Sequence, residues 1–263
     1  MMTKKRTAVL SVLALCSVLM TGCGSKIPAN RVNSIADLNG KKIGVQKGTT
    51  ADTLAGDIEN AEPQRYVKAA DGVQALEQGV IDAVIADLET ANTFLETHPG
   101  IRILDEAFAE EEYAIAVGKN NTELQKELNS ALMQLFVDGT LGAIKSNYEG
   151  DEKGQHPYVP KTDVKRDKGK LYMATNAEFP PYEWREGEDI VGFDVDMMNA
   201  VCDYLGYELQ ISDLAFEAVI PNVENGIADV GVAGLSVTDE RKEHVLFTNV
   251  YATTHQVVIV RNN

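Results

Sequence analysis

The chain repeats one pattern of apolar and polar positions, first at 72–87 and again at 218–234. In each copy, apolar residues recur every three or four positions, which predicts a helix, and Gly79 or Gly226 ends that helix. Three residues after each glycine, an aspartate opens a short apolar run that is typical of a buried parallel strand. The repeat therefore predicts two similar α/β lobes.

Each lobe also has a predicted first strand, at 42–46 and at 170–174, and each strand leads through a loop into a predicted helix. Those helices cover 51–59 and 194–205. Alternating strands and helices favour a doubly wound sheet, in which ligands bind beyond the carboxyl ends of the strands. If the lobes face each other, the loops at these ends line one cleft. The loops are 46–50, 87–89, 176–184 and 234–241.

Composition agrees with two domains and narrows the range of partners. The chain has 263 residues, 44% of them hydrophobic, which is enough for two cores of ordinary size. It carries 24 Lys and Arg against 40 Asp and Glu, a formal net charge of −16. Nucleic acid is excluded as a partner, because its binding needs a basic face and the sequence has none.

The N-terminus has the pattern of a secretory signal. Basic residues at 4–6 precede an apolar stretch at 8–20 that is too short for an ordinary spanning helix, and Cys23 follows. The end of this stretch resembles a bacterial lipobox, which implies that Cys23 is lipidated and becomes the mature N-terminus. The alternative is a plain secretory signal with a cysteine there by chance.

The cysteines do not support a disulfide framework or a cysteine metal site. Cys16 would leave with the signal and Cys23 would carry lipid, so Cys202 remains alone. Cys202 lies on a predicted helix and is expected to be a small buried apolar residue.

The candidate chemistry suits binding of a zwitterion better than catalysis. Standard catalytic motifs are absent from the sequence, the four histidines are scattered, and we expect no cofactor and no metal.

Arg241 can hold a carboxylate with its two-pronged guanidinium. Thr49 and Thr50 lie before a helix, where free N–H groups favour the same anion. Asp87 ends a buried strand, where an unpaired charge would be costly and an ammonium group would satisfy it. Taken alone, each residue is more typical of a surface salt bridge or a helix cap, so the prediction depends on their convergence at one site.

Six segments resemble the polar amino-acid-binding proteins of bacterial ABC importers. They are 175–184, 192–196 and 233–241 for that family's first lobe, and 39–45, 48–50 and 81–87 for its second. The resemblance extends over nearly all of 34–263. It implies an α/β periplasmic-binding-protein-like fold, in which two doubly wound sheets are joined by a hinge.

The resemblance also implies roles for individual residues. Arg241 and Thr49 would bind the α-carboxylate of an amino acid, and Asp87 its α-ammonium. Around the ligand would lie Thr50, the backbone of Gly234, the hydroxyl of Ser236, the rings of Phe179 and Phe216, and, near the side-chain tip, Asn176, Glu178 and Gln46. The last three favour a polar or cationic ligand side chain. Two alternatives stay open, namely Phe216 as plain core and Glu178 facing water.

The order of the segments departs from the family. The usual order starts with the lobe found here at 169–254, whereas this chain starts with the other lobe, so we predict a circular permutation. A truncated tandem protein would give a similar order. With ends at Ser34 and Asn263, we expect one covalent crossing between lobes, near 113–118. The predicted parts are 1–22 (lipoprotein signal peptide), 23–33 (tether), 34–112 (lobe with Asp87), 113–150 (hinge strand and closing helices), 151–168 (linker), 169–254 (lobe with Arg241) and 255–263 (C-terminal hinge strand).

The expected function is that of a lipid-anchored extracytoplasmic receptor, which closes around a free amino acid and delivers it to an ABC permease. We expect a monomer that is not an enzyme and contacts the membrane only through its lipid. One alternative is an enzyme on the same fold, similar to cyclohexadienyl dehydratase, with Glu178 as its acid. Another is the sensing module of a signalling receptor.

Overall fold

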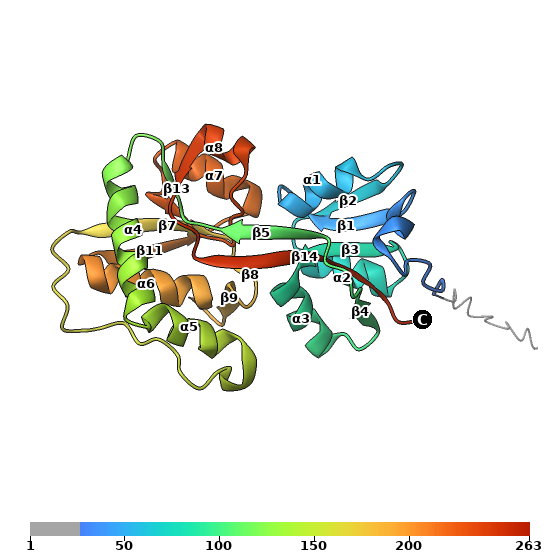
Figure 1. The fold of residues 1–263 in the computed structure, drawn as a ribbon, viewed down its shortest axis with the longest axis horizontal. Helices are drawn as coiled ribbons and strands as arrows, with labels where there is room; N and C mark the ends of the chain where they lie inside the picture. Colours follow the sequence, from blue (N-terminus) through green and yellow to red (C-terminus); the bar gives the residue numbers. More distant parts are fainter. Residues whose placement is uncertain (1–26) are drawn as a thin grey trace, which may run out of the picture.

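The computed structural model describes residues 27–263, so the predicted signal peptide and Cys23 lie outside the described residues. Two lobes are visible in Figure 1, with a pair of long strands running between them. We call the lobe with the N-terminal strands lobe A and the other lobe B. Between residues 27 and 263, no helix has both the length and the apolar character needed to cross a membrane.

Lobe A is built on a sheet whose parallel strands come from the first part of the chain. β1 (Lys42–Gln46) lies between β2 (Glu62–Tyr66) and β3 (Ala83–Asp87), and all three run parallel. β14 (Ala252–Arg261) pairs antiparallel with β3 and also with β4 (Ile101–Ile103) and β5 (Ala109–Tyr113). The helical elements of this lobe are η1 (Ile35–Leu38), α1 (Thr50–Asp57), α2 (Ala69–Glu77) and α3 (Leu88–Thr97).

Lobe B has a second mixed sheet. β7 (Lys170–Thr175) lies between β11 (Glu208–Asp213) and β12 (Val230–Gly231), and these strands run parallel. β6 (Ala116–Gly118) and β13 (Val245–Phe247) extend the sheet antiparallel. A small separate sheet contains β8 (Glu178–Phe179), β9 (Glu183–Glu186) and β10 (Asp189–Val191). The helices are α4 (Thr122–Val137), α5 (Thr140–Tyr148), η2 (Gly150–Glu152), α6 (Phe193–Leu205), α7 (Phe216–Glu224) and α8 (Asp239–His244).

The predicted repeat of helix, glycine and strand is confirmed. α2 is followed by Gly79 and β3, and α7 is followed by Gly226 and β12. Both glycines have positive φ, 72° and 68°, a conformation that favours glycine just after a helix. All five residues of β3 are buried, as expected for a strand covered on both faces.

The lobes are joined by two covalent crossings, so the expectation of a single crossing is wrong. The chain passes from β5 in lobe A to β6 in lobe B, and returns from β13 to β14. β5 and β14 run side by side as an antiparallel pair, with Ala252 opposite Tyr113 and Gln256 opposite Ala109 (Figure 1). The sequence interpretation missed the return because the pairing of β14 with β3 is long-range, and it leaves no local pattern.

The two ends of the described chain meet on lobe A. The backbone N–H of Asn30 donates a hydrogen bond to the carbonyl of Asn263 at 2.8 Å. Val32 is fully buried in the core of this lobe. Residues 151–168 run along lobe B instead, where the Asp203 carboxylate on α6 accepts hydrogen bonds from the Tyr158 hydroxyl and from the backbone N–H of Lys161.

Cys202 on α6 is buried, as predicted for a small apolar residue. Burial raises the pKa of its thiol to about 12, so the thiolate is disfavoured at neutral pH.

Candidate functional site

A pocket lies between the lobes, where strand ends from both sheets face each other. The loops after β1, β3, β7 and β12 all contribute to the pocket or to its edge. Several lining residues are among those predicted to contact a ligand, namely Gln46, Thr49, Thr50, Asp87, Phe179, Phe216, Gly234, Ser236 and Arg241. The structure therefore brings together residues that lie almost two hundred positions apart in the sequence.

Asn176 and Glu178, the other two residues predicted to contact a ligand, lie beside the pocket and bridge the lobes. The Gln46 amide donates a hydrogen bond to Asn176 Oδ1 at 2.8 Å. Glu178 forms an ion pair with Lys68, with Oε1 and Nζ 2.5 Å apart. The open alternative that Glu178 faces water is only partly right, because its side chain is 31% exposed.

Arg241 presents a guanidinium to the pocket from α8. Its Nη1 donates to the Ser236 carbonyl at 2.9 Å, and its Nη2 donates across the lobes to the Gly48 carbonyl at 3.3 Å. The guanidinium carbon lies 5.4 Å from the centre of the Phe216 ring, which is within the range of a cation–π interaction. Within residues 27–263, no carboxylate lies within ion-pair distance of this guanidinium. Burial lowers the pKa of Arg241, and the group can still donate to an anion.

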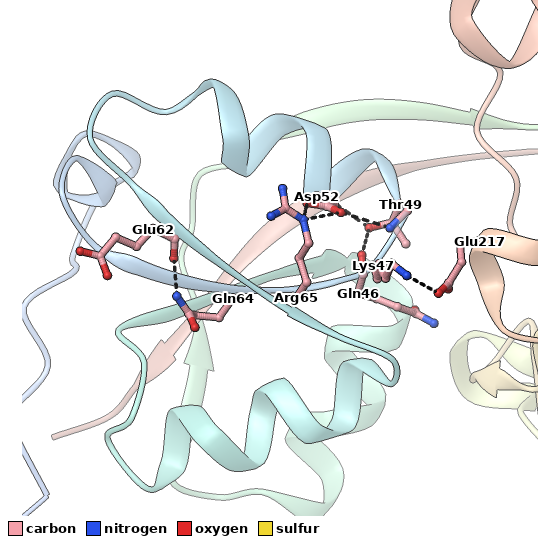
Figure 2. A network of polar contacts seen from close by, with 9 residues as sticks. Gln46, Lys47, Thr49, Asp52, Glu62, Gln64, Arg65 and Glu217 are labelled. Atoms are coloured by element: carbon pink, nitrogen blue, oxygen red, sulfur yellow. Dashed lines mark hydrogen bonds and ion pairs between the residues drawn. The ribbon is translucent and has the colours of Figure 1, made fainter.

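The start of α1 adjoins the same part of the pocket. Thr49 is the N-cap of this helix, and its hydroxyl donates to the Gln46 carbonyl at 2.8 Å and accepts from the Asp52 N–H at 3.3 Å (Figure 2). The first N–H groups of a helix lack intrahelical partners and attract anions. Thr49, Thr50 and Arg241 together can therefore bind a carboxylate, with the Thr49 hydroxyl already engaged in the cap.

Asp87 is not the unpaired charge that the sequence suggested. Its Oδ1 accepts from the backbone N–H groups of Glu89 at 2.9 Å and Thr90 at 3.3 Å, which caps α3. Its Oδ2 accepts from the hydroxyls of Tyr113 at 2.9 Å and Thr254 at 2.7 Å. The carboxylate is 1% exposed, and burial raises its pKa to about 6. An ammonium ligand would therefore join or displace these donors.

Two further polar residues in the pocket were not predicted. Glu111 on β5 and Gln256 on β14 are both buried, and the Gln256 amide donates to Glu111 Oε2 at 2.7 Å. Both line the pocket from the pair of crossing strands. Alternation along β5 could have revealed Glu111, because Glu110 and Glu112 are exposed while Glu111 and Tyr113 are buried.

Gly234 makes room for an aromatic ring at the pocket wall. Its φ is +52°, and a Cβ at this position would lie 2.4 Å from the ring of Phe179. Phe179 in turn stacks on Tyr182, with ring centres 5.1 Å apart. The Gly234 N–H donates to Asp194 Oδ2 at 3.0 Å, so it is already used within the protein. The expectation that the backbone of Gly234 assists the carboxylate therefore does not extend to its N–H group.

A second cavity of about 600 Å³ continues from the pocket on the β5 side. It shares Thr49, Thr50, Ser236 and Arg241 with the pocket, and acidic residues of β5 line its other wall. The predicted carboxylate-binding end of the site therefore lies next to solvent-accessible space.

Comparison with known proteins finds a family match in the last third of the chain. Residues 171–263 match the family model for bacterial extracellular solute-binding proteins, family 3. Residues 171–263 belong to this family. The matched range contains four of the residues predicted to contact a ligand, namely Phe179, Gly234, Ser236 and Arg241. The two-lobed α/β architecture is the periplasmic-binding-protein fold that the sequence predicted.

Several curated proteins that are similar to this chain are named as amino-acid-binding proteins. The arginine-binding extracellular protein ArtP of Bacillus subtilis (strain 168) is 35% identical over 132 residues, which is 50% of this chain and 47% of that protein. The probable histidine-binding protein of Neisseria gonorrhoeae is 36% identical over 94 residues, 35% of each chain. The L-cystine-binding protein TcyJ of Escherichia coli (strain K12) is 31% identical over 121 residues, 45% of this chain and 46% of that protein. The matches thus span at most about half of these relatives.

Proposed function

We propose that this protein is an extracytoplasmic substrate-binding protein, which captures a free polar or cationic amino acid between its lobes and delivers it to an ABC permease. The observation that carries the proposal is the chemistry of one pocket. Arg241, without a carboxylate partner in the described chain, shares this pocket with the start of α1 and with the carboxylates of Asp87 and Glu111. A zwitterion matches these opposite charges. The names of the curated relatives support an amino acid as ligand.

Capture would proceed by closure of the lobes around the ligand. Protein contacts already connect the two sides of the cleft: the Thr90 hydroxyl donates to the Pro180 carbonyl at 2.8 Å, and Lys47 pairs with Glu217 at 2.9 Å. A ligand that touches Arg241 in lobe B and Asp87 in lobe A would add contacts present only in the closed arrangement. It would therefore favour closure over opening.

We infer that lipid on Cys23 holds the protein at the cell membrane and that the protein works as a monomer. An enzyme with Glu178 as its acid is less well supported, because the Glu178 carboxylate is engaged by Lys68 at the edge of the pocket.

A thermal-shift screen of the mature protein against the twenty amino acids tests the proposed function. At about 100 times its dissociation constant, a ligand adds about 2.7 kcal/mol to the free energy of unfolding, which raises the melting temperature measurably. We expect one or a few polar or cationic amino acids to give this shift. The deaminated or decarboxylated analogue of each hit is the control. If no amino acid shifts the melting temperature, the proposal is wrong.

We also propose that the order of the chain is a circular permutation. Two features support it. Asn30 and Asn263 are hydrogen-bonded, so a direct connection there would need little new chain. Residues 151–168 make the opposite connection, from the closing helix α5 to β7, both in lobe B.

A rearranged chain tests this order. Residues 155–263 would be joined through a short glycine–serine linker to residues 27–154, which leaves every crossing strand and the contacts of Asp203 in place. Because both forms present the same pocket, we expect the same ligand to bind, with affinities that agree within about tenfold, or about 1.4 kcal/mol. Calorimetry on both forms makes the comparison. A rearranged chain that unfolds cooperatively but binds nothing would contradict the permutation.

A further inference from the structure

A cluster of buried polar side chains lies behind the pocket loop at 233–236. Glu183 on β9 and Asp194 on α6 are both 0% exposed. Asp194 Oδ2 accepts from the Gly234 N–H at 3.0 Å and from the Tyr251 hydroxyl at 2.9 Å. The Tyr251 N–H donates to the Tyr113 carbonyl at 2.9 Å. Asp194 therefore connects the pocket loop to the strands that cross between the lobes.

The carboxyl oxygens of Glu183 have no donor of their own. Neither Oε1 nor Oε2 has a hydrogen-bond partner within residues 27–263, and the same is true of Asp194 Oδ1. The groups that face Glu183 are acidic, because Asp194 and Asp213 both act on it electrostatically. The nearby cation, Arg185, forms an ion pair with Asp213, with Nη2 and Oδ2 2.7 Å apart. The other titratable groups facing the pair are the hydroxyls of Tyr182 and Tyr251.

Two buried carboxyl groups in this setting cannot both be ionised. Burial first, and then the charge of Asp194, raise the pKa of Glu183 well above its usual 4.5. Contacts of Asp194 with Gly234, Glu183 and Tyr251 offset part of the effect of burial and leave its pKa at about 6. Asp194 is thus the ionised member of the pair at neutral pH. A protonated Glu183 would give Asp194 Oδ1 the hydrogen-bond donor that it lacks.

We propose that Glu183 is protonated in the folded protein and donates a hydrogen bond to Asp194, and that it is a positioning residue for the pocket loop. The proton lets the ionised Asp194 hold the Gly234 N–H and the Tyr251 hydroxyl at once. Glu183 does not line the pocket and acts on the ligand only through Asp194. The positioning role rests on the proposed amino-acid binding, whereas the protonation does not.

The pH dependence of stability tests the proton. A carboxyl group whose folded pKa is raised stabilises the fold below its unfolded pKa, and this stability is lost as the pH rises towards the folded pKa. The E183Q variant supplies an N–H donor that does not titrate. From about pH 6.5 upward, we expect the unfolding constant of the wild type to rise with pH relative to that of E183Q, by up to about tenfold per pH unit. Denaturant unfolding at each pH gives both constants.

The matched control is E186Q, which changes an exposed glutamate on the same strand. Its unfolding constant should follow the wild type at every pH. A ratio between wild type and E183Q that does not change with pH would overturn the protonation of Glu183. If E183Q does not fold, the infrared spectrum of the wild type at neutral pH decides, because a buried protonated carboxyl group gives a carbonyl band that ionised carboxylates lack. Absence of this band also overturns the proton.

Affinity tests the positioning role. We expect E183Q to bind the ligand found by the screen within about threefold of wild type, because the donor to Asp194 is kept. The E183L variant has similar size and no donor, so it should bind at least tenfold more weakly while still folding. Equal affinities of E183Q and E183L would overturn the positioning role. If the wild type binds no amino acid, the proposed function fails, and the pH series still decides whether Glu183 carries the proton.

Discussion

An Arg241→Ala variant is expected to bind every amino-acid ligand of the wild type at least thirtyfold more weakly. The guanidinium is the pocket's cation, it is partly buried, and its carboxylate partner would be common to all amino acids. Removing one partner of a buried charge pair costs about 2–5 kcal/mol, and 1.4 kcal/mol corresponds to a factor of ten. Titration calorimetry against each ligand of the wild type measures the loss.

The control for Arg241 is Lys242→Ala, on the same short helix. Lys242 pairs with Asp239 at 3.1 Å, and its side chain is 53% exposed, so its loss should leave the affinity within about twofold. An Arg241→Lys variant separates charge from geometry, because lysine keeps the charge but lacks the planar fork that grips both carboxylate oxygens. Unchanged affinity in Arg241→Ala would remove this residue from the site.

An Asp87→Asn variant is expected to lose at least tenfold in affinity for amino acids while keeping its fold. Asparagine is also a good helix N-cap, and its amide can meet the hydroxyls of Tyr113 and Thr254, which accept as well as donate. The carboxylate charge is lost, and with it the attraction for an ammonium group in a buried site. Calorimetry with the amino acid and with its deaminated analogue measures the effect, since only the amino acid should be weakened.

The affinity for amino acids should also depend on pH through Asp87. Burial raises the pKa of Asp87 to about 6 without a ligand, and an ammonium group binds the ionised form. The affinity of the wild type should therefore fall as the pH drops through 6, by up to tenfold per pH unit, and the affinity of Asp87→Asn should depend less on pH. If the deaminated analogue binds the wild type as well as the amino acid does, Asp87 does not hold the ammonium group.

The sequence predicted those features that local periodicity encodes. The helix–glycine–strand repeat identified both sheets, and the rule that ligands bind at the carboxyl ends of parallel strands identified the loops of Thr49, Asp87 and Arg241. These are patterns within a few residues of each other, or consequences of strand direction. They do not depend on knowing which distant segments pair.

The features that escaped prediction depend on long-range pairing. Asp87 looked unpaired because two of its donors, Tyr113 and Thr254, come from the crossing strands, 26 and 167 residues away. Glu111 was not predicted, and its hydrogen-bond partner Gln256 comes from β14, 145 residues away. The second crossing between the lobes was missed for the same reason, since β14 leaves lobe B and pairs with β3 in lobe A.

The contacts between the lobes and the residues inside the pocket control two different properties, the strength of ligand binding and the choice of ligand. Gln46 and Thr90 make contacts between the lobes but also line the pocket, whereas the ion pair of Lys47 with Glu217 joins the lobes through residues that do not line it. In a protein that binds only when closed, the observed dissociation constant is the intrinsic one divided by the closed fraction. Substitution of Lys47 or Glu217 would therefore scale the affinity for all ligands by one common factor. The ranking among amino acids would be left to the residues inside the pocket, so the strength of capture and the choice of ligand could evolve independently.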